Sequence, residues 1–129
     1  MARVSTSKRY DVSGQEMWER IGDPGRIYEW HPAIEATEVL DGGTRRVNTL
    51  GDGGRVSETI LEQAERHHTW RIDESPLPVD NLIATLRVRD EGEGACVVEC
   101  EATFDPAGVP DDDAVELNRG FFQAGLDAL

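Results

Sequence analysis

The sequence is poor in basic residues, and this shortage excludes two classes of partner. Its 13 Lys and Arg stand against 26 Asp and Glu, which gives a formal net charge of −13. Nucleic-acid binding needs clustered basic side chains that release counterions from the phosphate backbone, so we expect no nucleic-acid partner. The same charge disfavours adsorption to an anionic membrane. The acidic residues are expected to form a solvated surface that keeps the protein soluble.

Long apolar runs are also missing. No stretch of the chain approaches the ~20 apolar residues that a membrane-spanning helix needs, so we expect no membrane insertion. The N-terminal residues Met1-Ala-Arg-Val-Ser lack the apolar core of a secretory signal. We therefore expect a cytoplasmic location.

Cysteine is scarce, and the two that occur offer no disulfide. Cys96 and Cys100 lie four apart in an expected strand, so their Cα atoms would be ~13 Å apart, beyond disulfide reach. They share one face of that strand, which favours buried free thiols. Neither Cys nor His clusters with carboxylates at zinc-site spacing, and no glycine-rich loop precedes a helix as in phosphate sites. We expect no metal and no cofactor.

The chain does contain a regular order of short elements. Its 129 residues, 38% of them hydrophobic, suit one domain over residues 1–129. Ser13 and Glu16 form a capping box that starts a short helix. Asp23-Pro24 starts a second short helix, which Pro32 ends. Alternating apolar residues and turn signals predict seven strands, namely residues 3–10, 34–40, 45–50, 56–62, 69–73, 81–89 and 95–104.

The last expected element is the longest helix. Pro110 and Asp111-Asp-Asp113 mark its first turn, where carboxylates suit the positive end of the helix dipole. Apolar residues then recur at three-four spacing and form a wide face. These residues are Ala114, Leu117, Phe121, Ala124 and Ala128, widened by Phe122, Leu126 and Leu129. So wide a face predicts an α+β fold in which a seven-stranded antiparallel sheet wraps around this helix and encloses a cavity.

The order strand, two short helices, six strands and long helix resembles the START-like, helix-grip superfamily, also called SRPBCC. Within it, the chain resembles the bacterial polyketide cyclase/dehydrase-like family. The residues that carry this resemblance are Trp30-His31-Pro32, residues 49–54, Ser57-Glu58, residues 76–78, Asn81, residues 103–108 and residues 125–129. The resemblance implies a helix-grip fold and a cavity for a hydrophobic ligand. Plant abscisic-acid receptors, distant members of the superfamily, have a pocket glutamate at the position of Glu58, with gate and latch loops at residues 50–54 and 76–78.

Glu58 is the strongest candidate for a functional residue. Its strand parity matches Val56 and Ile60, so its carboxylate is expected to face inward among apolar neighbours. A buried carboxylate is costly unless paired, and burial would raise its pKa. Glu58 is therefore the best candidate for a ligand contact or a general base. The alternative is a structural ion pair with Arg45 or Arg46 across the hairpin, and parity with Val47 and Thr49 favours Arg45 as the inward arginine.

Aromatic and histidine residues supply further candidates. Trp30 and Trp70 offer apolar surface and one N–H donor each, which suits either a ring-bearing ligand or ordinary core packing. His31 lies beside Trp30 and could reach the cavity mouth, whereas His67-His68 is expected in an exposed turn. The remaining ligand-binding candidates are Asn81, Phe104, Phe121 and Phe122.

Three functions from different classes remain open. The first is a carrier or sensor that binds a small polyketide-, lipid- or hormone-like molecule. The second is a polyketide cyclase or dehydratase, in which Glu58 acts as general base while an arginine or Asn81 polarises a carbonyl oxygen. The third is a stress or partner-binding protein whose cavity is incidental. A monomer and a homodimer are both compatible with the sequence.

Overall fold

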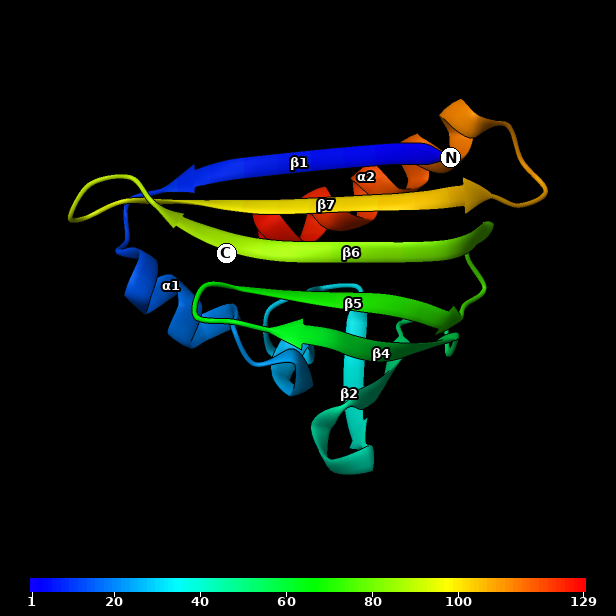
Figure 1. The fold of residues 1–129 in the computed structure, drawn as a ribbon, viewed down its shortest axis with the longest axis horizontal. Coiled ribbons are helices and arrows are strands. Elements are labelled where there is room, and N and C mark those ends of the chain that lie inside the picture. The colour runs from blue at the N-terminus through cyan, green and yellow to red at the C-terminus, as the bar shows by residue number, and fades with distance from the viewer.

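The computed structural model describes residues 1–129 and contains one antiparallel sheet of seven strands, flanked by helices (Figure 1). The strands are β1 (Ala2–Tyr10), β2 (Ile34–Leu40), β3 (Arg45–Leu50), β4 (Arg55–Gln63), β5 (His67–Glu74), β6 (Val79–Asp90) and β7 (Cys96–Pro106). The α-helices are α1 (Gly14–Ile21) and α2 (Asp111–Asp127), and the 3₁₀ segments are η1 (Pro24–Glu29) and η2 (Asp41–Gly43). No helix is long and apolar enough to cross a membrane.

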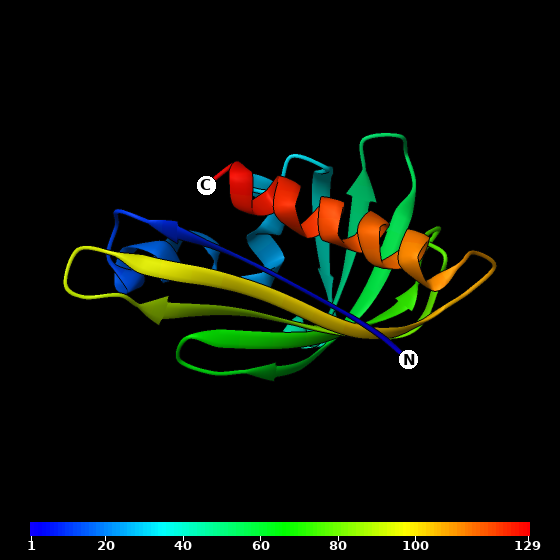
Figure 2. The same cartoon turned by 90° about the horizontal axis from the view of Figure 1, so that it is seen from above.

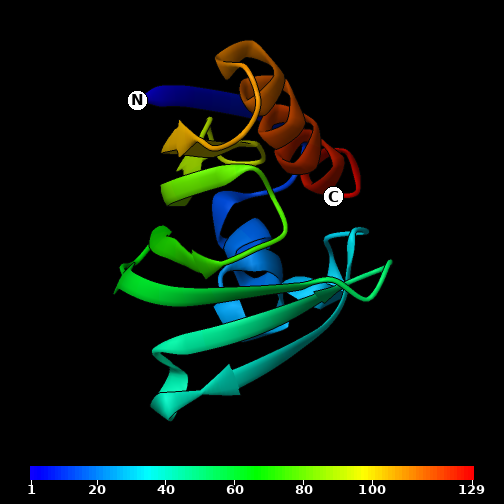
Figure 3. The same ribbon diagram turned by 90° about the vertical axis from the view of Figure 1, so that its right-hand side faces the viewer.

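The strand order is β1-β7-β6-β5-β4-β3-β2, with every pair antiparallel. The sheet curves around α2, as Figures 2 and 3 show. Register shifts that mark β-bulges occur at Ile34/Ala36, Ser57/Glu58, Ile60/Glu62 and Asp80/Ile83. Because each bulge bends its strand and increases the local twist, these irregularities help the sheet to wrap the helix. The expected helix-grip fold is confirmed.

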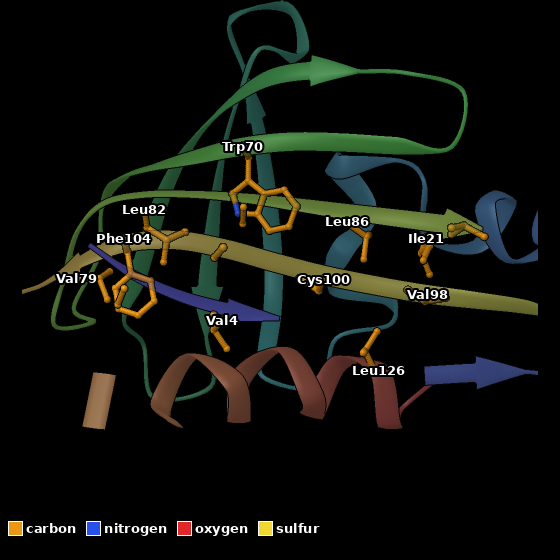
Figure 4. Close-up of a cluster of buried hydrophobic side chains, with 14 of the residues drawn as sticks. Val4, Ile21, Trp70, Val79, Leu82, Leu86, Val98, Cys100, Phe104 and Leu126 are labelled. Atoms are coloured by element: carbon orange, nitrogen blue, oxygen red, sulfur yellow. The ribbon is translucent and has the colours of Figure 1, made fainter. Parts of the chain in front are cut away.

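The core lies on the inner face of this sheet. The alternation of buried and exposed residues along its strands was predictable from the sequence. Alternate residues of β6 and β7 are buried, in agreement with the expected inward faces. Side chains from β1, β5 and α1 join them, and Leu126 packs from α2 (Figure 4). Cys96 and Cys100 are both buried and free, as expected.

Two N-cap side chains start the two short helices that follow β1. The Ser13 hydroxyl accepts a hydrogen bond from the Glu16 amide at 3.1 Å and starts α1. Asp23 accepts one from the Gly25 amide at 2.9 Å and starts η1, with Pro24 at its first position. This second helix is 3₁₀ rather than α and is kinked at Arg26. It contacts β2 and β3 and brings the next residues of the chain towards the inner face of the sheet.

Helix α2 buries only part of the face that its apolar spacing predicts: Ala114 and Leu126 are buried, and Phe121 and Phe122 are partly buried. Leu117 is 46% exposed and Ala128 is exposed, whereas Asn118 is buried. The amide of Asn118 donates to the Ala114 carbonyl at 2.9 Å, one turn earlier in the same helix. Because its donor is satisfied within the helix, this polar side chain can point inward at low cost. The buried residues of α2 are therefore Ala114, Asn118, Gly125 and Leu126, a face turned away from Leu117 and Ala128.

Candidate functional site

One cavity lies between the inner face of the sheet, η1 and α2. It has a volume of about 50 Å³ and is lined by 20 residues, of which 14 are hydrophobic. A water molecule needs about 10–15 Å³ measured in this way, so the cavity has room for a few waters. The lining residues are Ile27, Trp30, His31, Ile34, Arg46, Asn48, Leu50, Val56, Glu58, His68, Trp70, Ile72, Leu77, Leu82, Leu86, Cys100, Asn118, Phe121, Phe122 and Leu126.

The polar residues that line this cavity are nearly all the buried polar residues of the protein. Seven polar or charged residues are buried, and all of them except Thr6 belong to the lining. The six are His31, Arg46, Asn48, Glu58, His68 and Asn118. Interiors normally bury few such groups, because each must be hydrogen-bonded or paired to offset its lost hydration. Their gathering in one place distinguishes the cavity from a packing defect.

The strongest polar contact in the cavity is an ion pair between β3 and β4. Arg46 Nε donates to Glu58 Oε1 at 2.6 Å, and Asn48 Nδ2 donates to the same oxygen at 3.1 Å. Arg46 Nη1 donates to the Pro24 carbonyl at 2.7 Å, which ties the sheet to η1. The two charged side chains are only 1% and 6% exposed. Burial raises the pKa of the Glu58 carboxyl, although Arg46 and Asn48 oppose this effect.

The inward arginine is Arg46, so the expectation that Arg45 faces inward was wrong. Arg45 is partly exposed, donates to Ser57 Oγ at 3.1 Å and lies 3.7 Å from an Asp41 carboxylate oxygen. In the β3–β4 ladder Arg46 is directly opposite Glu58, and opposite residues of an antiparallel pair share a face. The inward position of Glu58 therefore also fixes that of Arg46. Parity with Val47 was misleading because the inner face of β3 is polar.

His31 lines the cavity as expected, but both of its ring nitrogens are occupied. Its Nε2 lies 2.8 Å from the Phe121 carbonyl oxygen and must donate to it, while the Ala33 amide donates to Nδ1 at 3.2 Å. Burial lowers the pKa of the ring, which is consistent with this neutral tautomer. The ring also packs on Phe121 at 4.4 Å between centroids. A Cβ atom at Gly125 would lie 2.7 Å from this ring, so glycine permits the close approach of α2.

His68 is buried in β5, so its expected place in an exposed turn was wrong. The strand begins at His67, and His68 lies 2% exposed between Trp18 and Trp70, at ring-centroid distances of 5.7 and 5.4 Å. Burial and the charge of Arg46 lower the pKa of His68 to about 3, so the ring is neutral at neutral pH. The signal that could have found it is period-two spacing with Trp70 and Ile72.

Three side-chain atoms of the protein are buried without a hydrogen-bond partner: Trp30 Nε1, Arg46 Nη2 and His68 Nδ1. All three belong to residues that line this cavity. An unpartnered buried polar atom costs about 1–3 kcal/mol, so native proteins seldom leave one without a reason. Every buried side-chain polar atom that lacks a partner therefore belongs to a residue of this cavity.

The other expected site residues divide into two groups. Trp70, Phe121 and Phe122 line the cavity, whereas Phe104 and Asn81 do not. Phe104 is 1% exposed and belongs to the hydrophobic core cluster, as Figure 4 shows. Asn81 is exposed at the bulge of β6.

The role of Asn81 is local. It has a left-handed backbone with φ of 54°, and its amide donates to Asp105 at 3.0 Å. Asparagine tolerates this conformation better than most residues, which explains its place at the bulge. The lining residues that the sequence did not suggest include three polar ones, Asn48, His68 and Asn118.

Two loops contribute to the cavity through leucines. Leu50 precedes the β3–β4 loop, Leu77 lies in the β5–β6 loop, and both line the cavity. The loops approach each other, because a Cβ atom at Gly54 would lie 3.5 Å from Pro76. These are the loops at the positions of the gate and latch in the resemblance described above.

A curved antiparallel sheet that holds a C-terminal helix over a mixed apolar and polar cavity defines a helix-grip protein. The family model described as "Polyketide cyclase / dehydrase and lipid transport" matches residues 1–129, and the chain belongs to this family. A search of curated proteins gave no significant match.

Solved structures give the same fold. The chain is similar to the protein XoxI from Bacillus cereus, with 31% identity and a TM-score of 0.96, over 99% of this chain and 92% of that one. A START superfamily protein from Mycobacterium smegmatis is 12% identical, with a TM-score of 0.83, over 99% and 94% of the two chains. Norcoclaurine synthase from Thalictrum flavum, in complex with dopamine and hydroxybenzaldehyde, is 20% identical with a TM-score of 0.74, over 98% and 82%. The last two likenesses concern the fold alone.

Proposed function

We propose that the chain binds a small, apolar, ring-bearing molecule in the cavity beneath α2. The observation that carries this proposal is the gathering of six of the seven buried polar residues in a cavity whose other 14 lining residues are hydrophobic. Ligand sites are typically apolar with a few convergent polar groups. A buried ion pair such as Arg46–Glu58 adds little to stability compared with apolar residues of the same volume. Ligand recognition would explain why polar groups that are costly to bury occur in this cavity.

The aromatic lining supports a ring-bearing ligand. Trp30, Trp70, Phe121 and Phe122 all line the cavity, and aromatic rings favour offset or edge contacts with other rings. The family description includes lipid transport. The fold relative norcoclaurine synthase holds dopamine and hydroxybenzaldehyde, which are both aromatic. These comparisons favour a carrier or an enzyme for ring compounds over a purely structural protein.

Binding requires the cavity to widen. Pockets for drug-sized ligands are about 300–1,000 Å³, whereas this cavity is about 50 Å³. The partly exposed rings of Phe121 and Phe122, and the loops that carry Leu50 and Leu77, are the lining groups best placed to move. A ligand that displaces these rings and loops would make contact with their apolar surface.

The two buried cysteines provide a matched test of this site. Cys100 lines the cavity, whereas Cys96 is equally buried on the same face of β7 but lies outside the lining. We expect the neutral fluorescent probe N-phenyl-1-naphthylamine to bind saturably to the wild-type protein. Cys100→Met should weaken binding by filling the cavity, while Cys96→Met should leave it unchanged. Absence of saturable binding, or equal loss in both variants, would count against the proposal and favour an incidental cavity.

A second candidate is a ring-closing or dehydrating enzyme in which Glu58 is the general base. The raised pKa of this buried carboxyl favours it, because a base that titrates nearer neutrality suits proton abstraction next to a carbonyl. Arg46 would then polarise the carbonyl oxygen. With a poly-β-ketone substrate, Glu58→Gln should abolish turnover while retaining probe binding. Turnover that survives in Glu58→Gln, or is absent from the wild type, would exclude this role for Glu58.

A further inference from the structure

We propose that the bound molecule is uncharged and carries both a carbonyl oxygen and a hydroxyl group on its ring system. This inference rests on the function proposed above and names the chemical class of its ligand. It follows from the three buried side-chain atoms that have no partner within the protein, Trp30 Nε1, Arg46 Nη2 and His68 Nδ1. A ligand that satisfies all three must match their hydrogen-bonding roles.

Two of these atoms require an acceptor on the ligand. The guanidinium of Arg46 has N–H donors and no acceptor, and its Nε and Nη1 already donate to Glu58 and to the Pro24 carbonyl. The remaining nitrogen, Nη2, can only donate. The indole nitrogen of Trp30 is likewise a donor without acceptor capacity. A carbonyl oxygen has two lone pairs and no hydrogen, so it can accept hydrogen bonds from both donors. It is also uncharged, which suits a cavity lined mainly by apolar residues.

The third atom suits a hydroxyl group on the ligand. The His68 ring is neutral at neutral pH, so one of its nitrogens carries a hydrogen and the other a lone pair. Its Nδ1 is buried and has no partner within the protein. A hydroxyl both donates and accepts, so it can pair with Nδ1 whichever ring nitrogen carries the hydrogen.

The charges around the site favour an uncharged ligand. The guanidinium of Arg46 already faces the carboxyl of Glu58, with 2.6 Å between Nε and Oε1. A ligand carboxylate beside Arg46 would lie next to this carboxyl and would have to lose its hydration. The formal net charge of the chain is −13, which also disfavours an anion. A ketone oxygen accepts the same hydrogen bond without either cost.

Trp70 indicates where the ring of the ligand would lie. The Arg46 guanidinium carbon lies 5.2 Å from the Trp70 ring centroid, and the His68 ring lies 5.4 Å from it. Two of the three residues with an unpartnered atom therefore flank the same indole. Figure 4 shows the Trp70 side chain pointing from β5 into the interior beneath the sheet. A ligand ring in contact with this indole would bring its oxygens within reach of both neighbours.

Four naphthalenes with one ring system and different substituents test the inference on the wild-type protein by isothermal titration calorimetry. They are 2-methylnaphthalene, 2-acetonaphthone, 2-naphthol and 2-naphthoate. We expect the ketone and the naphthol each to bind about ten-fold more tightly than the hydrocarbon, and the naphthoate to bind more weakly than the ketone. Equal affinities, or tightest binding by the naphthoate, would overturn the inference while the proposed function stands. Absence of binding by all four would overturn both.

Single substitutions test which protein atom is responsible for the preference for the naphthol and for the ketone. His68→Phe keeps an aromatic ring but removes Nδ1, so the naphthol should lose its advantage over 2-methylnaphthalene while the ketone keeps its own. Trp30→Phe should reduce the advantage of the ketone alone. His67→Phe, at the partly exposed neighbour of His68, is the control and should change neither ratio. A naphthol preference that persists in His68→Phe would refute the assignment of the hydroxyl to His68. The wild-type series decides the question if a variant does not fold.

Discussion

Replacing Glu58 by leucine should destabilise the protein strongly, and a second substitution should restore part of the loss. In Glu58→Leu the Arg46 guanidinium stays buried at 1% exposure without its counter-charge, and Asn48 Nδ2 loses its acceptor. Removing one partner of a buried pair typically costs about 3–5 kcal/mol, because the other charge is left uncompensated. For a chain of this size each kcal/mol lowers Tm by about 3–5 °C, so we expect Tm to fall by about 10–25 °C.

The double variant Glu58→Leu/Arg46→Met removes both charges. It still leaves the Pro24 carbonyl without the donor that Arg46 Nη1 supplies at 2.7 Å, and Asn48 Nδ2 without its acceptor, so it should remain at least about 1–3 kcal/mol below the wild type. The two single variants and the double variant form a thermodynamic cycle. Their coupling energy should be at least about 2 kcal/mol.

Urea unfolding followed by tryptophan fluorescence and circular dichroism measures these free energies. Arg45→Met is the matched control, because Arg45 is adjacent in sequence but partly exposed, and its loss should change the free energy of unfolding by less than about 0.5 kcal/mol. If the effects of Glu58→Leu and Arg46→Met simply add in the double variant, the charges are not coupled, and the reasoning from a buried pair is refuted.

Two further predictions concern His68 and Asn81. The pKa of His68 is about 3 in the folded protein and about 6.5 when unfolded. The unfolded chain therefore binds the extra proton, and stability falls as pH drops below 6.5, by up to about 1.4 kcal/mol per pH unit. Between pH 7.5 and 5 the wild type should thus lose about 1–2 kcal/mol more than His68→Phe in urea titrations, and parallel curves would contradict this. Asn81→Gly should leave both stability and N-phenyl-1-naphthylamine binding close to those of the wild type, because glycine adopts its φ of 54° freely and the hydrogen bond to Asp105 that it removes is exposed. Altered probe binding in that variant would contradict its place outside the cavity.

Most of the fold was predictable because its signals are local. Period-two alternation found the inner faces of β6 and β7, and hydroxyl and carboxylate caps found the starts of α1 and η1. The inward direction of Glu58 also followed from alternation with Val56. These features depend on neighbours within a few residues, which a sequence shows directly.

The polar part of the site was predicted less well, because it depends on pairing between strands. Parity within the strand favoured Arg45, and only the β3–β4 register places Arg46 opposite Glu58. His68 was assigned to a turn because its charged neighbours suggested exposure, although β5 already begins at His67. Asn118 was overlooked since its inward position depends on a hydrogen bond within α2. Polar residues on inner faces contradict the apolar pattern on which sequence interpretation depends.

The pairing of β1 with β7 has a consequence for synthesis on the ribosome. Ala2 lies opposite Phe104, so the first strand finds its partner only after the chain between them has been made. At about 5–20 residues per second, translation from β1 to the end of β7 takes roughly 5–20 s. During that interval the apolar side of β1, which includes Val4, has neither β7 nor α2 to cover it. Cavity formation therefore comes late in synthesis, because both β7 and α2 follow the rest of the sheet in the chain.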